Sequence, residues 1–272
     1  MKRMLESMKE NYGNPSSNHS FGRKSKAAME TSRRTIATLL NAEPSEIFFT
    51  SSGTEADNMA IRGAVRDAGV KHIITSKIEH PAVLNTVQHL LRKNKVTVDY
   101  VNTNSLGEVD INHLKKLLLK NNNVLVSLMH GNNEIGNLLD LALVSKICKE
   151  NNALFHSDTV QTIGHYEFDL KKISIDFLTC SAHKFHGPKG VGFLYINKDV
   201  NITPLIHGGS QERNMRGGTE CLYGIVGLSK AMEVAYKDLT KHRKHIEKLK
   251  IHMISQIKEK LPFSSFNGLS DS

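Results

Sequence analysis

The sequence has few cysteines and none of the spacings that bind zinc or form a redox pair. Only Cys148, Cys180 and Cys221 occur in 272 residues, and no two of them are arranged as C-x-x-C. A disulfide scaffold and a zinc knuckle are therefore excluded. So few thiols in a chain of this length indicate a reducing compartment, and we expect a cytoplasmic protein.

Long hydrophobic runs are also missing. No run approaches the ~18 residues of a membrane span. Residues 1–10 are charged and amphipathic, and they lack the apolar core of a signal peptide. The sequence therefore predicts no membrane association.

A nucleic-acid motif is missing too, although the formal net charge is +9. The basic residues are spread along the chain, and no zinc finger or RNP signature accompanies the densest run at 241–260. We interpret this run as a solvated basic helix face. Walker and G-x-G-x-x-G loops do not occur either.

What the sequence does contain is a regular alternation of strand and helix patterns. Such alternation predicts a mostly parallel seven-stranded sheet with helices on both faces, in an α/β fold. The expected strands, which are short and rich in β-branched and aromatic residues, are 46–50, 71–75, 97–101, 124–129, 153–156, 177–180 and 192–196; the expected helices include 55–68, 81–92, 111–119 and 140–151.

The C-terminal third has a different pattern. Apolar residues recur at three- and four-residue steps from Gly227 to Leu261, which predicts one long helix that Pro262 ends. We therefore expect a large domain over 1–227, a connecting helix over 228–261, and the start of a further, truncated domain over 262–272.

Ligands of parallel α/β sheets bind at the carboxyl ends of the strands, so the residues after each strand are the candidates. Gly53 and Thr54 follow the first strand and open a helix, where unpaired amides favour an anion; plain helix capping is the alternative. His80 precedes a helix-starting proline and is either a cap or a stacking platform.

Two further strand ends carry polar groups. Asn133 lies in a glycine-bracketed loop that either contacts a ligand or uses asparagine for a turn. Asp158 ends a buried strand, where a carboxylate needs a cation, a metal or a protonated ring nitrogen, unless it caps a helix. Gln161 follows three residues later and can face the same cavity.

The strand 177–180 is followed by Ser181, His183 and Lys184. A lysine at a buried strand end has no easy structural role, and burial prepares its amine for a Schiff base. His183 and His186 have no third ligand nearby, so we expect no metal site. A phosphate cradle, a stacking platform, a ring-nitrogen carboxylate and a reactive lysine together indicate pyridoxal 5′-phosphate.

At this point the chain resembles the cysteine desulfurases of the NifS/IscS type, within the class V aminotransferase family. The resemblance covers nearly the whole chain, and as a set its motifs are highly specific. The matching stretches, in family order, are 12–17 (YGNPSS), 49–58 (FTSSGTEADN), 75–80 (TSKIEH), 129–136 (MHGNNEIG), 158–161 (DTVQ), 181–184 (SAHK), 187–190 (GPKG) and 207–219 (HGGSQERNMRGGT).

The resemblance implies a fold-type-I large domain, pyridoxal 5′-phosphate as cofactor, L-cysteine as substrate and a homodimer. It also implies that sulfur passes to a protein thiol as a persulfide and then to an acceptor such as an iron–sulfur scaffold. Carried over by position, the implied roles are as follows: Lys184 binds the cofactor covalently, His80 stacks on its ring, Asp158 pairs with the ring nitrogen, Gln161 donates to the ring hydroxyl oxygen, Asn133 contacts substrate, and Gly53, Thr54, Ser181, His183 and, across the dimer interface, Thr219 bind the phosphate.

The chain also departs from the family pattern. The small-residue motif that family members carry before the Gly-Asn-Pro-Ser stretch is missing, and so is the small domain with the nucleophilic cysteine and a substrate-binding arginine. We interpret Cys148, Cys180 and Cys221 as structural, so this chain alone is expected to lack sulfur transfer. The alternatives are another class V enzyme, either an aminotransferase or a selenocysteine lyase, and a non-catalytic truncated fragment.

Overall fold

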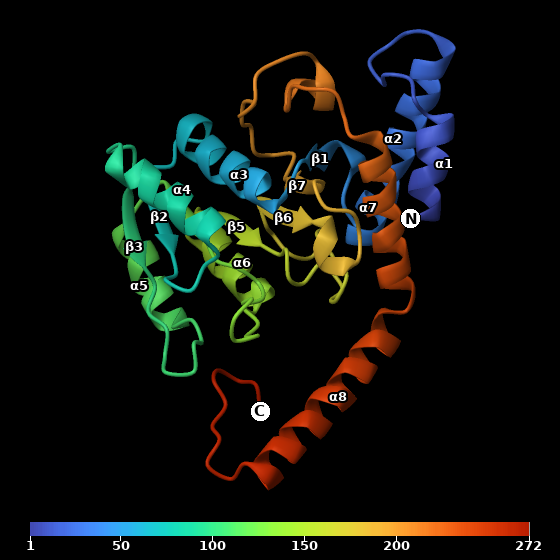
Figure 1. The fold of residues 1–272 in the computed structure, drawn as a ribbon. Coiled ribbons are helices and arrows are strands. Elements are labelled where there is room, and N and C mark those ends of the chain that lie inside the picture. The colour runs from blue at the N-terminus through green and yellow to red at the C-terminus, as the bar shows by residue number, and fades with distance from the viewer. Residues whose placement is uncertain (272) are drawn as a thin grey trace.

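The computed structural model describes residues 1–271, which form one α/β body and a projecting helix (Figure 1). The strands are β1 (Ile47–Thr50), β2 (His72–Thr75), β3 (Thr97–Tyr100), β4 (Val124–Ser127), β5 (Leu154–Asp158), β6 (Phe177–Ser181) and β7 (Gly192–Ile196). The helices are α1 (Lys2–Glu10), α2 (Ser20–Leu40), α3 (Gly53–Asp67), α4 (Pro81–Arg92), α5 (Ile111–Lys120), α6 (Leu141–Glu150), α7 (Leu222–Lys237) and α8 (Leu239–Lys260).

The seven strands form a single sheet in the order β1-β7-β6-β5-β4-β2-β3. Strand β7 is antiparallel to both of its neighbours, and the pairings from β6 to β3 are parallel. The predicted mostly parallel seven-stranded sheet is confirmed. Because β2, β4, β5 and β6 run in one direction, the loops that follow them lie at one edge.

Helices cover both faces of the sheet, and each face has its own apolar core. One core joins the sheet to α2, α5, α6 and α7 through side chains such as Ile36, Leu114 and Ile225. The other joins it to α3 and α4 through Met59 and Val83. Strand residues alternate between these cores, which fixes the face on which each polar side chain at a strand end lies.

Helix α2 is not among the helices expected from the sequence. Its buried face includes Ser25, Ser32 and Arg33 as well as Met29 and Ile36. Polar residues therefore interrupt the apolar stripe, and the hydrophobic period of a helix is weak there.

The prediction of one long helix over 228–261 is wrong. Two helices replace it: α7 begins earlier, at Leu222, and the chain breaks at Asp238 before α8. The expected boundary at residue 227 falls inside α7, whose Leu228 and Met232 are fully buried in the core. The last buried residue of the two helices is Leu239, beyond which α8 points away from the sheet (Figure 1).

Within residues 1–271, no helix combines the length and apolar character that crossing a membrane requires.

Candidate active site

The first turn of α3 meets the ends of β5 and β6. A Cβ atom added to Gly53 would lie 2.7 Å from Val160 and 3.5 Å from Ser181, so only glycine allows this close approach. Ser52 caps the helix by accepting a hydrogen bond from Glu55 N at 3.2 Å. In residues 1–271 no hydrogen bond is found for the amides of Gly53 and Thr54. Capping and an available anion site therefore coexist here.

Asp158 occupies the end of β5 with little exposure. Its Oδ1 accepts a hydrogen bond from Val160 N at 2.9 Å, which forms a turn and not the cap of a helix. Burial and, to a smaller extent, the nearby Asp57 raise the pKa of Asp158 to about 7. A cation beside this carboxyl group would favour its ionised form.

Lys184 lies on the short 3₁₀ turn Ala182–Phe185 that follows β6. The strand end is buried as expected, but the lysine itself is exposed. His165 Nε2 lies 3.1 Å from the Lys184 carbonyl oxygen and ties this turn to the segment after β5. Strand β5 pairs with β6 so that Asp158 lies opposite Thr179, and the turn that carries Lys184 begins three residues after Thr179.

Ser181 and His183 both precede the lysine and contact each other. Ser181 Oγ is 2.9 Å from His183 Nδ1. Burial, followed by the charges of Lys184 and Lys189, lowers the pKa of His183. A group that binds here therefore meets a neutral imidazole and a hydroxyl that already share a hydrogen bond.

His80 is the N-cap of α4, and its Nδ1 accepts a hydrogen bond from Ala82 N at 3.1 Å. His80 therefore acts as a helix cap, one of the two roles expected from the sequence. The side chain is nevertheless exposed, so the cap leaves a ring face open.

Asn133 is exposed and its amide contacts only the neighbouring Glu134 at 3.0 Å within the described chain. Its neighbour Asn132 is buried instead. Asn132 donates to Ile78 O at 2.8 Å and accepts from the amides of Glu134 and Ile135. Sequence reasoning missed this role, by which Asn132 joins the loop after β4 to the segment that carries His80.

Glu79 is a second residue that sequence reasoning missed. Its Oε1 accepts hydrogen bonds from Ser76 Oγ at 2.7 Å and Met129 N at 3.1 Å. Burial raises its pKa to about 8. Glu79 therefore anchors the segment before His80 to the end of β4, and its position directly beside His80 is the only local signal of this role.

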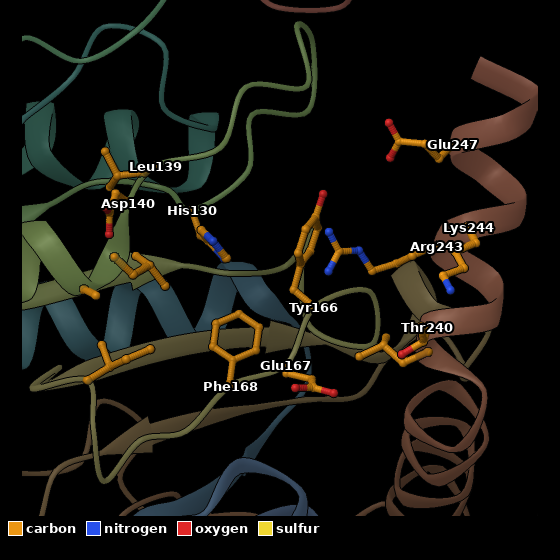
Figure 2. Close-up of a pocket in the computed structure, with 14 residues that line it drawn as sticks. His130, Leu139, Asp140, Tyr166, Glu167, Phe168, Thr240, Arg243, Lys244 and Glu247 are labelled. Carbon is orange, nitrogen blue, oxygen red and sulfur yellow. The ribbon is translucent and has the colours of Figure 1, made fainter. Parts of the chain in front are cut away.

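Gln161 is half-buried and lines a cavity of about 670 Å³ between the body and α8. An adjoining cavity of about 690 Å³ is lined by residues that include His130, Asp140 and Tyr166 (Figure 2). Arg243 of α8 extends across the gap, and its guanidinium carbon lies 4.6 Å from the Tyr166 ring centre. This contact joins α8 to the body in the wall that the two cavities share.

Thr219 is exposed and lines a separate cavity of about 110 Å³ with Thr50, Ser51 and Arg216. Arg216 pairs with Glu55 of α3 at 2.9 Å. The loop that carries Thr219 is therefore tied to the first turn of α3.

The three cysteines differ in their surroundings. Cys148 and Cys180 are buried, and burial raises the pKa of both thiols. Cys221 is exposed at the N-cap of α7.

Comparisons with known proteins show which family the chain resembles. The family model described as "Aminotransferase class-V" matches residues 1–271. The chain is 46% identical to a cysteine desulfurase IscS of Dictyoglomus turgidum, covering 96% of this chain and 66% of that protein. It is 45% identical to a cysteine desulfurase IscS of Clostridium botulinum, covering 100% of this chain and 68% of that protein. The chain thus spans about two thirds of the length of these relatives.

Solved structures show the same likeness. A NifS-like protein superposes with a TM-score of 0.91 at 43% identity, over 95% of this chain and 71% of that one. A structure titled "SspA in complex with cysteine" superposes with a TM-score of 0.81 at 34% identity, over 85% of this chain and 67% of that one.

Proposed function

Because the chain belongs to the class V aminotransferase family, we propose that the protein is a cysteine desulfurase that uses pyridoxal 5′-phosphate (PLP). The observation that carries this proposal is the convergence of the Lys184 turn, Asp158 and the first turn of α3 at one edge of the sheet. Relatives named cysteine desulfurase support the activity, and the cysteine complex of a structural neighbour supports the substrate.

The residues present fit PLP. The unpaired amides of Gly53 and Thr54 and the Ser181–His183 pair offer donors for a phosphate. Asp158, whose pKa burial raises to about 7, lacks a cation that a protonated pyridine nitrogen would provide. The exposed amine of Lys184 is accessible to an aldehyde.

PLP, when bound, supplies the electron sink for the charge left at Cα of an amino acid when its proton is removed. Lys184 would hold the cofactor and then accept that Cα proton. Asp158 would keep the ring nitrogen protonated, and His80 would pack on the ring face. Gln161 would donate to the ring hydroxyl oxygen, Asn133 would contact the substrate, and a partner's Thr219 would complete the phosphate site.

The sulfur-transfer half requires a thiolate that reaches the substrate sulfur and carries it away as a persulfide. The buried Cys148 and Cys180, with their raised thiol pKa, do not suit this role. We assign no nucleophile among the three cysteines. We further propose that the protein is a homodimer in a reducing cytoplasm. Its sulfur would pass to an acceptor such as an iron–sulfur scaffold.

The test is a product assay with the full-length gene product, PLP and L-cysteine, because the 272-residue chain alone is expected to lack sulfur transfer. We expect alanine and sulfide in equal amounts when a thiol reductant is present. Lys184→Ala should abolish both products, whereas Lys198→Ala, a change at another exposed lysine, should leave them unchanged. Amino transfer to a keto acid without sulfide would instead identify an aminotransferase, and activity on selenocysteine alone would identify a selenocysteine lyase.

A further inference from the structure

Helix α3 carries a carboxyl group into the interior of the protein. Asp57 is 1% exposed, and its Oδ1 has no hydrogen-bond partner within residues 1–271. The nearest ring nitrogen, Nε2 of His156, lies 3.3 Å from this oxygen. A buried carboxyl group without a hydrogen-bond partner lowers the stability of the fold. Asp57 is not among the residues proposed to contact PLP or substrate.

A row of polar side chains crosses three strands beneath Asp57. Ser127 Oγ of β4 lies 2.8 Å from His156 Nδ1 of β5, and Thr179 Oγ1 of β6 lies 3.2 Å from His156 Nε2. Burial lowers the pKa of His156 to about 4, so the imidazole is neutral and supplies no positive charge. Burial also raises the pKa of Asp57 to about 7, against a hydrogen bond from Thr179 that lowers it.

Asp57 and Asp158 share the same face of the sheet. His156 and Asp158 are two residues apart on β5, so both point towards α3. The titratable groups that act on the pKa of Asp158 are Asp57 from α3, which raises it, and His156 and His80, which lower it. Glu79 lies in the same surroundings, because Asp158 and Asp57 both raise its pKa.

Within residues 1–271 no lysine or arginine forms an ion pair with these carboxyl groups, and burial holds the pKa of Asp57 and Asp158 at about 7 and that of Glu79 at about 8, so at neutral pH all three are partly protonated. They are not arranged as a metal site, since no suitable group of three ligands is found in the described part of the chain. A cation that enters beside Asp158 would favour ionisation of Asp57 as well.

We propose that Asp57 is a further positioning residue of the cofactor site: it places a second negative charge behind Asp158, and this charge helps to hold the pyridine ring of PLP in its protonated form. The inference rests on the proposed function, because it requires PLP to bind with its ring nitrogen against Asp158. Asp57 would act through Asp158 and would not touch the ring itself.

The test compares Asp57→Asn, which keeps the shape and removes the charge, with Asp110→Asn. Asp110 is the exposed N-cap of α5, where asparagine caps equally well. Both proteins are loaded with PLP labelled with ¹⁵N at the ring nitrogen, and the chemical shift of this nitrogen is followed against pH. Asp57→Asn should move deprotonation of the ring about one unit lower in pH and weaken PLP binding about tenfold; Asp110→Asn should change neither.

Unfolding of the PLP-free protein provides a second measurement. The pKa of Asp57 is raised in the folded state, so its protonated form favours folding, and stability is lost as pH rises from about 4 towards 7. The wild type should therefore lose free energy of unfolding relative to Asp57→Asn across this range. His156, whose pKa is lowered, has the opposite dependence on pH.

The outcomes separate the two hypotheses. If the wild type binds no PLP, the proposed function fails and this inference fails with it. If the wild type binds PLP and Asp57→Asn changes only the stability, Asp57 is merely structural and the inference alone is wrong. If Asp57→Asn does not fold, Thr179→Val replaces it. Loss of the hydroxyl should raise the pKa of Asp57 and thereby move deprotonation of the ring nitrogen to lower pH, as Asp57→Asn would. An unchanged pH dependence of the ring nitrogen would reject the inference.

Discussion

At the residue scale, the candidate site contains side chains that keep reactive or hydrogen-bonding groups available for a ligand. Lys184 is exposed while the strand that delivers it is fully buried. Its backbone carbonyl, and not its amine, makes the contact with His165. A rigid strand therefore fixes the position of the residue while the amine stays available for chemistry.

Covalent labelling tests this assignment. Reduction of the PLP-loaded protein with borohydride should fix the cofactor on one lysine, and peptide mapping should place it on Lys184. The amine of Lys184 is expected to react because it lies beside the proposed phosphate donors Ser181 and His183. A Lys198→Ala variant should be labelled normally. Label on Lys189 or Lys77 would contradict the assignment.

At the element scale, the loop before α7 is held in an unfavourable backbone conformation. Glu212, Arg213 and Asn214 all have positive φ angles, which are uncommon for residues other than glycine. The Glu212 carboxylate accepts hydrogen bonds from Phe49 N of β1 at 2.8 Å and from two guanidinium nitrogens of Arg33 at 2.8 and 2.9 Å. A buried ion pair thus clamps this loop to α2 and β1.

Removing one member of this pair should strongly destabilise the protein. Glu212→Gln removes the buried counter-charge of Arg33 and leaves only its pairing with the partly exposed Glu30, so we expect a loss of about 3–5 kcal/mol in the free energy of unfolding. Urea denaturation of the wild type and the variant measures this loss. The matched control is Glu233→Gln in the exposed Lys230–Glu233 pair of α7, which should cost less than about 1 kcal/mol. Equal effects of the two changes would show that the Arg33–Glu212 pair does not hold the loop.

At the scale of the whole molecule, we propose that the site is shared between two subunits. In this single chain Thr219 is exposed, and α1 exposes Met1, Leu5 and Met8 to solvent. These features are compatible with a surface that a second copy covers. We therefore expect a homodimer in which Thr219 of one subunit contacts the phosphate bound by its partner.

Mixed dimers test the shared site directly. Thr219→Val should weaken retention of PLP, whereas Thr240→Val, at an exposed threonine of α8, should not. A dimer of one Lys184→Ala subunit and one Thr219→Val subunit should regain one intact site, because the unchanged Thr219 would serve the unchanged Lys184. Light scattering gives the oligomeric state. A monomer that retains PLP tightly, or a mixed dimer without recovered binding, would reject this arrangement.

The sequence by itself determined the strand and helix alternation and the strand-end positions of Asp158 and Lys184. These features are local: a short buried run predicts a strand, and the residues after it lie at the ligand-binding edge of the sheet. The tertiary structure decided the rest. Arg33 meets Glu212 across 179 residues, Asp57 faces the side chains of β5, and the chain breaks at Asp238 where α7 leaves the core. Such contacts depend on strand order and helix packing. The hydrophobic period of a strand (2 residues) or a helix (3.6 residues) gives no information about either.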